Sequence, residues 1–232
     1  MKEVNDLEDL LIHHIQNLYA AEEQMLEALP PVIEKAQHSS LKRALEHHLK
    51  LTLEQKKRLE AVLLLINERK SSEKNKLALL PDTQYQCKGM IGLIAEAKEL
   101  MEGKLAKEVT DAAIIACVQK MEHYEITTYG TAHAYAEQLD LPKAAALLSE
   151  TLNEEYDIDD LLTALATSSF NKEAEPEGIA SIEDQVPETD KIMGGSSKNT
   201  GTTHISERTI NSPGGRAGTS HRRYPSGESR GH

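Results

Sequence analysis

The segment QKMEHYEITTYGT, residues 119–131, decides the fold, because it places carboxylates inside a pattern that otherwise predicts a buried helix face. Val118 and Met121 recur at helical spacing, and Glu125 falls on the same face. Glu122 lies one turn before Glu125. A buried carboxylate is costly unless it is protonated, paired or bound to a cation. The segment therefore predicts a core helix that carries a polar site.

Outward from this segment, the chain divides by composition into a helix-forming part and a hydrophilic tail. Residues 1–170 carry 18 basic and 29 acidic side chains and are rich in Leu, Ala, Ile, Glu and Lys, a composition typical of helical proteins. Eight of the 13 glycines follow residue 190. We expect a folded domain over residues 1–170 and a disordered tail over residues 171–232, acidic in 171–190 and basic and Gly/Ser-rich in 191–232.

Charge and hydropathy exclude several classes of partner. A net charge of −12 disfavours nucleic acid and anionic membranes as partners of the folded domain. No segment approaches roughly 18 consecutive apolar residues, and the N-terminus lacks the apolar core of a signal peptide. We therefore expect a cytoplasmic protein with no membrane contact, in which Cys87 and Cys117 are free thiols. The sequence identifies no partner for the tail.

Apolar periodicity predicts an all-α fold. We expect four long helices over about residues 6–37, 39–66, 110–139 and 142–165, and one short helix over 86–103. Candidate N-caps precede the first two, at Asn5 or Asp6 and at Ser39 or Ser40. Pro30 and Pro31 should kink or break the first helix. Four long helices with one apolar stripe each favour an up-and-down bundle, with the short helix packed across one end.

Each long helix carries a polar residue close to its midpoint. Glu22, Gln55, Glu125 and Glu155 each lie within roughly 3 Å of mid-helix, so a bundle would place them in one layer. Carboxylates that share a buried layer repel each other unless metal ions compensate them, as in di-iron and di-manganese centres. For any single glutamate a solvated helix face is the simpler explanation. Three glutamates at matching heights favour a metal site.

The residues leave two interpretations open for His48 and Glu122. A lone core histidine is more often satisfied by a protein acceptor than by a metal, and His48 lies about 9 Å below mid-helix by its rise along the axis. Glu122 is either a second ligand or a partner on the helix surface. Tyr129 is better explained as a packed core residue than as a redox-active neighbour. Three other polar residues are expected beside the ligands or on the surface: His123, Glu154 and Asp159.

Five stretches of this sequence resemble the YciE/YciF family of bacterial ferritin-like proteins: NLYAAEEQMLEALP, HLKLTLEQKKRLE, CKGMIGLIAEAKEL, DAAIIACVQKMEHYEITTYGTAHAYAEQLDL and LLSETLNEEYDIDDLLTALA. They lie in order within residues 5–168, and EHYEITTYGT is the most specific. The resemblance implies a ferritin-like four-helix bundle, a homodimer, a role in bacterial stress responses and a dinuclear iron or manganese carboxylate site. The ligands that it implies are Glu22, His48, Glu122, Glu125 and Glu155.

One position departs from the family pattern. The family usually has His-Leu-Glu-Glu-Thr in the second helix, whereas residues 48–52 here are HLKLT. Leu51 replaces a carboxylate one turn after His48, and leucine cannot bind a hard cation. The sequence therefore predicts a one-ion site, a dinuclear site completed by water or Gln55, or a bundle that retains the acids without metal. The function is accordingly either a metal-dependent oxidase or peroxidase, or a non-catalytic oligomeric stress protein with a degenerate metal site.

Overall fold

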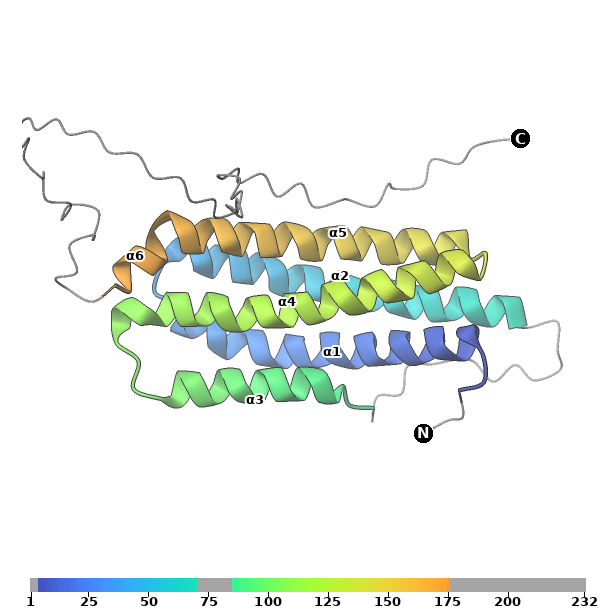
Figure 1. Ribbon diagram of the computed structural model, residues 1–232, viewed down its shortest axis with the longest axis horizontal. Coiled ribbons are helices and arrows are strands. Elements are labelled where there is room, and N and C mark those ends of the chain that lie inside the picture. The colour runs from blue at the N-terminus through green and yellow to red at the C-terminus, as the bar shows by residue number, and fades with distance from the viewer. Residues whose placement is uncertain (1–3, 71–84, 176–232) are drawn as a thin grey trace, which may run out of the picture. The chain divides into compact units, whose positions relative to one another are not determined.

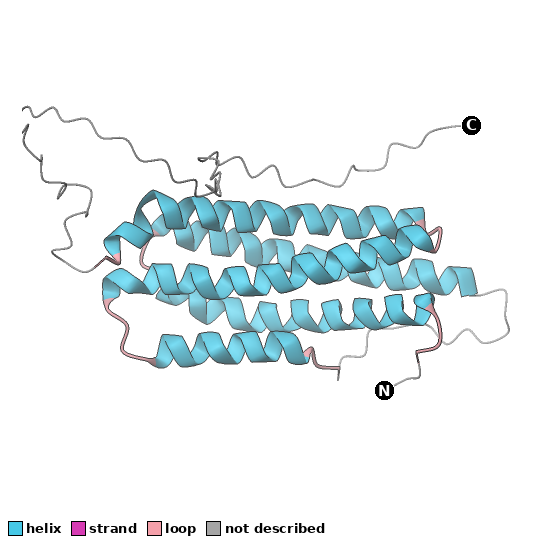
Figure 2. Cartoon of the chain, viewed as in Figure 1, coloured by secondary structure: helices cyan, strands magenta, loops and turns pink. Residues whose placement is uncertain are grey.

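The computed structural model describes residues 4–70 and 85–175. All secondary structure in these ranges is helical, as Figure 2 shows, which confirms the predicted all-α class. The helices are α1 (Leu7–Lys35), α2 (Ser39–Lys70), α3 (Lys88–Glu102), α4 (Lys107–Gln138), α5 (Pro142–Leu165), a π-helical turn (Ala166–Phe170) and α6 (Asn171–Glu173). Within the described ranges, no helix is both long and apolar enough to span a membrane.

The four long helices form a bundle in which each packs against two neighbours (Figure 1). Helix α1 packs against α2 and α4, and α5 closes the ring by packing against the same two helices. Helix α3 runs back along the bundle before α4 begins, so α2 and α4 run in the same direction at diagonal corners. Each long helix is therefore antiparallel to both neighbours. This arrangement confirms the predicted ferritin-like four-helix bundle with an extra short helix.

Helix α3 lies lengthwise beside α1 and α4 rather than across an end of the bundle, so its predicted position is wrong. Its inward face runs from Met90 through Ala97 to Met101, along almost the whole helix. A stripe of that length is covered only by lengthwise packing. At the start of α3, the Cys87 thiol accepts a hydrogen bond from the backbone N–H of Met90 and lies 3.0 Å from the Tyr124 hydroxyl.

Helix α1 begins as predicted and continues as a single helix through its two prolines to Lys35. Asp6 is its N-cap, and the Asp6 carboxylate accepts a hydrogen bond from the backbone N–H of Asp9 at 2.8 Å. The helix is unbroken through Pro30 and Pro31, so the expected break does not occur. Each proline removes one backbone N–H donor, and both lie within the last two turns, so only a short helical segment follows them. Buried neighbours, Leu29 among them, hold this part of α1 in the core.

Two other helix starts differ from the prediction. Ser39 is the first residue of α2 rather than its cap. The Asp111 carboxylate, which extends from α4, instead accepts the backbone N–H groups of Gln37 and His38, each at 2.8 Å. Helix α4 begins at Lys107, earlier than the expected start near residue 110. Tertiary contacts thus set these helix ends, which short sequence signals located only approximately.

The end of the bundle meets the start of the predicted tail. Phe170 is buried, and its ring lies 4.5 Å from the His38 ring, centroid to centroid. The first tail residues, 171–175, continue from it and include α6. The rest of the predicted disordered tail, residues 176–232, lies outside the described residues.

The core consists of two apolar clusters with a polar layer between them. In α1 the first cluster ends at Tyr19 and the second begins at Ala20, and in α4 the boundary falls between Met121 and Tyr129. The polar layer occupies this boundary in every long helix. Its most deeply buried polar residues are Glu22, His48, Thr52, Gln55, Glu122, Glu125, Thr151 and Glu155.

The contact between α3 and α4 can be tested with two glycines of α3. A Cβ atom added at Gly89 would lie 2.8 Å from Cε2 of Tyr124, whereas nothing lies within 4 Å of one added at Gly92. We expect Gly89→Ala to lower the free energy of unfolding by about 1–3 kcal/mol through overpacking. Gly92→Ala should raise it by up to about 1 kcal/mol through helix propensity. Denaturant unfolding of both variants checks this, and equal effects would contradict the close packing.

Candidate metal centre

All five ligands that the family resemblance implies lie buried in the polar layer. Each has at most 1% of its surface exposed to solvent: Glu22, His48, Glu122, Glu125 and Glu155. They come from four helices, one residue each from α1, α2 and α5 and two from α4. The expectation of a shared layer of carboxylates is therefore confirmed, and the alternative of ordinary surface glutamates is wrong for these residues.

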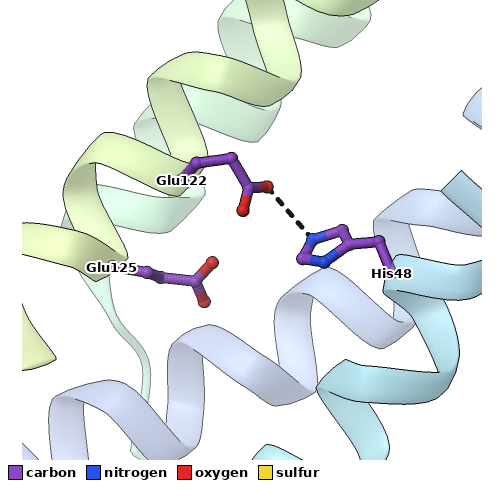
Figure 3. A group of neighbouring side chains, drawn as sticks. All are labelled: His48, Glu122 and Glu125. Carbon is purple, nitrogen blue, oxygen red and sulfur yellow. Dashed lines mark ion pairs between the residues drawn. The ribbon is translucent and has the colours of Figure 1, made fainter. Parts of the chain in front are cut away.

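Three of the five side chains converge on one point. His48 of α2 and Glu122 and Glu125 of α4 each offer one ligand atom, and these atoms lie within 4.8 Å of one another. Figure 3 shows the two carboxylates and the imidazole directed toward a common space. Nε2 of His48 lies 3.0 Å from Oε1 of Glu122. The dashed line in Figure 3 marks this pair, and neither of its two atoms has a hydrogen-bond partner.

His48 and Gln55 lie two turns apart on α2, and both side chains belong to the polar layer. Gln55 lies near the midpoint of α2 and donates to Glu155, as its predicted height implies. His48 lies about 9 Å from mid-helix along the axis, as expected, yet its ligand atom lies within 4.8 Å of those of Glu122 and Glu125. Its distance from mid-helix therefore does not exclude His48 from the layer.

Glu22 and Glu155 lie beside this group, and each has a hydrogen-bond partner of its own. The Tyr129 hydroxyl donates to Oε1 of Glu22 at 2.5 Å, and the Tyr129 side chain is fully buried. The Gln55 amide donates to Oε1 of Glu155 at 2.6 Å. The sequence indicated these partners only through helical spacing, which placed Gln55 on the stripe of α2 and Tyr129 one turn after Glu125.

A chain of polar contacts leads from Glu155 toward the surface. The Gln55 amide also donates to Glu154 at 3.2 Å. Arg58 binds both carboxylate oxygens of Glu154, at 2.6 and 2.7 Å, and pairs with Glu150 at 2.9 Å. Glu154 is thus a neighbour of the buried group, as expected.

The other two residues expected near the ligands lie on the α4 and α5 side. Asp159 is buried, and Nε2 of the exposed His123 lies 3.3 Å from its carboxylate. The Gln119 amide donates to Asp159 at 2.9 Å. The Asp159 charge contributes to the raised pKa of Glu122, so it lies close enough to influence the buried group.

The buried atoms of the layer are suited to a cation. In the described part of the chain, several buried side-chain atoms have no hydrogen-bond partner, and most of them belong to this layer. They include both ring nitrogens of His48, both oxygens of Glu122 and one oxygen each of Glu125 and Glu155. Buried polar atoms of native proteins are usually satisfied. One imidazole and several carboxylates form a donor set that suits iron or manganese.

Comparison with known proteins identifies the family. The model of a domain of unknown function, DUF892, matches residues 6–175. This chain belongs to the DUF892 family. It is 42% identical over 169 residues to Protein YciF of Escherichia coli (strain K12), a match that covers 73% of this chain and 95% of that protein. The YciF part of the predicted resemblance is therefore confirmed.

Two solved structures share the fold of this DUF892 chain. The crystal structure of the E. coli stress protein YciF is 40% identical with a TM-score of 0.63, and the match covers 73% of this chain and 99% of that one. YcfI from Rhodopseudomonas palustris is 36% identical with a TM-score of 0.61, covering 70% of this chain and 96% of that one. Both matches span nearly the whole of the two solved chains.

The leucine that departs from the family pattern lies one turn after His48 on α2 of this DUF892 chain. Leu51 is partly buried and packs against the apolar cluster that contains Leu45 and Met121. Glu54, the nearest alternative carboxylate on α2, is exposed and pairs with Lys57 at 2.8 Å. Helix α2 therefore contributes two polar groups to the layer, the His48 imidazole, which could bind a metal ion, and the Gln55 amide, which donates to Glu155.

Burial raises the pKa of every carboxyl group in the layer. The pKa of Glu122 rises to about 8, chiefly through loss of water. The pKa values of Glu22, Glu125 and Glu155 also rise, first through burial and then through the charges of neighbouring glutamates. Burial lowers the pKa of His48, although the charges of Glu155 and Glu22 oppose this shift. In the absence of a cation, the polar layer therefore favours protonated carboxyl groups and a neutral His48 imidazole.

This charge arrangement predicts how the stability of the metal-free protein depends on pH. The pKa of Glu122 rises from 4.5 to about 8 on folding, so between these values the folded chain binds more protons than the unfolded chain. Its free energy of unfolding therefore falls as the pH rises through that window. The lowered pKa of His48 acts in the opposite sense below 6.5. We expect Glu122→Gln to raise the Tm more at about pH 8 than at about pH 5.

Thermal unfolding in the presence of a chelator measures this difference. Glu27→Gln is the matched control, because Glu27 lies exposed on α1 and its replacement should leave the pH dependence unchanged. If Glu122→Gln changed the Tm equally at both pH values, Glu122 would not bind an extra proton on folding.

Proposed function

We propose that this DUF892 protein binds one iron or manganese ion in the middle of the bundle, through His48, Glu122 and Glu125. The convergence of their ligand atoms within 4.8 Å, in a fully buried layer, is the observation that supports the proposal most directly. The cation would compensate carboxylates whose pKa values burial otherwise raises. A bound ion of this kind would supply one-electron redox chemistry toward oxygen or peroxide.

A single ion is preferred to a dinuclear centre because the remaining carboxylates have other partners. Oε1 of Glu155 accepts the Gln55 amide, and Oε1 of Glu22 accepts the Tyr129 hydroxyl. Leu51 removes the carboxylate that the family pattern would add from α2. A second ion would have to use the other oxygens of Glu22 and Glu155, of which Oε2 of Glu155 has no hydrogen-bond partner, with one ligand fewer than the family pattern supplies.

The biological setting follows from the relatives. One solved relative is described as the E. coli stress protein YciF, and we propose a role in bacterial stress responses for this chain as well. A homodimer and a cytoplasmic location belong to the same proposal. Cys87 and Cys117 are free thiols, as expected for a reducing compartment. Sedimentation of the purified protein tests the dimer.

Metal analysis after expression with iron and manganese tests the site. We expect about one equivalent per chain, and none in Glu125→Ala or His48→Ala. His47→Ala is the matched control, because His47 is the exposed neighbour of His48 and its loss should leave the metal content unchanged. Metal should also raise the Tm of the wild-type chain, since it binds the folded state preferentially.

The Leu51→Glu variant tests whether the missing carboxylate limits the site to one ion. This variant restores a carboxylate one turn after His48 and should raise the metal content toward two equivalents per chain. Leu53→Glu, at an exposed position of the same helix, should not. Two equivalents in the unmodified chain would contradict a mononuclear site, and no metal in any variant would contradict metal binding altogether.

Oxidase or peroxidase activity is a second candidate, and Tyr129 is the observation that favours it. Its buried hydroxyl donates to Glu22 beside the proposed ion, and burial raises the pKa of Tyr129 well above its ordinary value. The hydroxyl can therefore hold a proton at Oε1 of Glu22. We expect the iron-loaded protein, supplied with a one-electron reductant such as ascorbate, to reduce hydrogen peroxide to water. Tyr129→Phe should slow this reaction at least tenfold, an increase of about 1.4 kcal/mol in the activation barrier, with unchanged metal content. If the iron-loaded wild-type protein did not turn over peroxide, the non-catalytic function would be the one supported.

A further inference from the structure

An apolar cleft lies outside the polar layer, between the C-terminal halves of α1 and α3 and the N-terminal half of α4. Its volume is about 330 Å³. The walls are formed mainly by Leu29, Val32, Ile94, Ala97, Val118 and Met121. This volume lies at the lower end of the range for small-molecule sites. It is too small to accept a helix of a partner protein.

The charges around the cleft are predominantly positive. Lys35 and Lys98 line it, against one acidic residue, Glu102. Nζ of Lys35 donates to the backbone carbonyl of Met101 at 2.9 Å, which links α1 to α3 at this end of the cleft. Lys98 is exposed and makes no ion pair with any residue that the structure describes. On a chain with a net charge of −12, an unpaired ammonium group beside an apolar cleft is suited to an anionic ligand.

We propose that this cleft binds a small amphiphile, a medium-chain carboxylic acid, with its alkyl chain between α1, α3 and α4 and its carboxylate at Lys98 and Lys35. At roughly 30 Å³ per non-hydrogen atom, the cleft of about 330 Å³ holds about eleven such atoms, enough for an alkyl chain of about ten carbons whose carboxylate oxygens lie outside at the lysines. Met101 and Met121 supply flexible, polarizable walls that adapt to an alkyl chain. This binding does not depend on the proposed metal ion.

Calorimetric titration of the full-length protein with decanoate tests the proposal. Decanoate should bind, decanol should bind more weakly, and a decyltrimethylammonium ion should bind least, because only the carboxylate matches the lysines. Lys98→Glu should weaken decanoate binding about fivefold. Lys143→Glu is the matched control, because it makes the same charge change on α5 at the opposite end of the bundle and should leave binding unchanged.

The two cysteines locate the bound molecule. Cys117 lines the cleft, whereas Cys87 lies at the N-terminus of α3 outside it. Decanoate should slow the alkylation of Cys117 by iodoacetamide at alkaline pH and leave that of Cys87 unchanged. Equal binding of all three amphiphiles, or equal protection of both thiols, would overturn the proposal. Protection of Cys117 that rises with protein concentration without ligand, together with dimer formation in sedimentation, would show that a second copy of the chain covers the cleft instead.

Discussion

The cost of burying charge in one layer is the constraint on which the rest of the bundle depends. Glu22, Glu122, Glu125 and Glu155 share that layer with a single imidazole, and loss of water raises the pKa of each carboxyl group. The apolar clusters lie on either side of this layer and include none of its polar residues. Natural proteins tolerate such a destabilising arrangement chiefly where it supports a function.

Neutral donors offset only part of the cost of the layer. The Tyr129 hydroxyl and the Gln55 amide each donate to one oxygen, of Glu22 and of Glu155 respectively. Both oxygens of Glu122 and one oxygen each of Glu125 and Glu155 remain without a hydrogen-bond partner among the described residues. Of these glutamates, Glu122 and Glu125 are the two whose ligand atoms converge with that of His48. This convergence is the physical reason for assigning the proposed ion to these three residues.

Features set by helical geometry could be predicted from the sequence, whereas features set by the mutual placement of helices could not. Because the rise per residue of a helix is fixed, the sequence alone places Glu22, Glu125 and Glu155 at one height. The approach of the His48 imidazole to Glu122 and Glu125 depends on how α2 packs in the bundle, for which the sequence contains no local signal. The lengthwise position of α3 and the cleft beside Cys117 depend on contacts between distant segments. Whether His48 or Leu51 has its side chain in the polar layer depends on the rotation of α2 about its own axis, which the sequence did not determine.

The diagonal arrangement of α2 and α4 gives the convergent group a mechanical consequence. These helices belong to different helical hairpins, α1 with α2 and α4 with α5, and they are not closely packed against each other. The two hairpins are joined by packing of α2 against α5 and of α1 against α4, and by the hydrogen bonds of Gln55 with Glu155 and of Tyr129 with Glu22. A cation shared by His48 of one hairpin and Glu122 and Glu125 of the other would act as a cross-brace. Its loading would stiffen the bundle against shear along the hairpin interface.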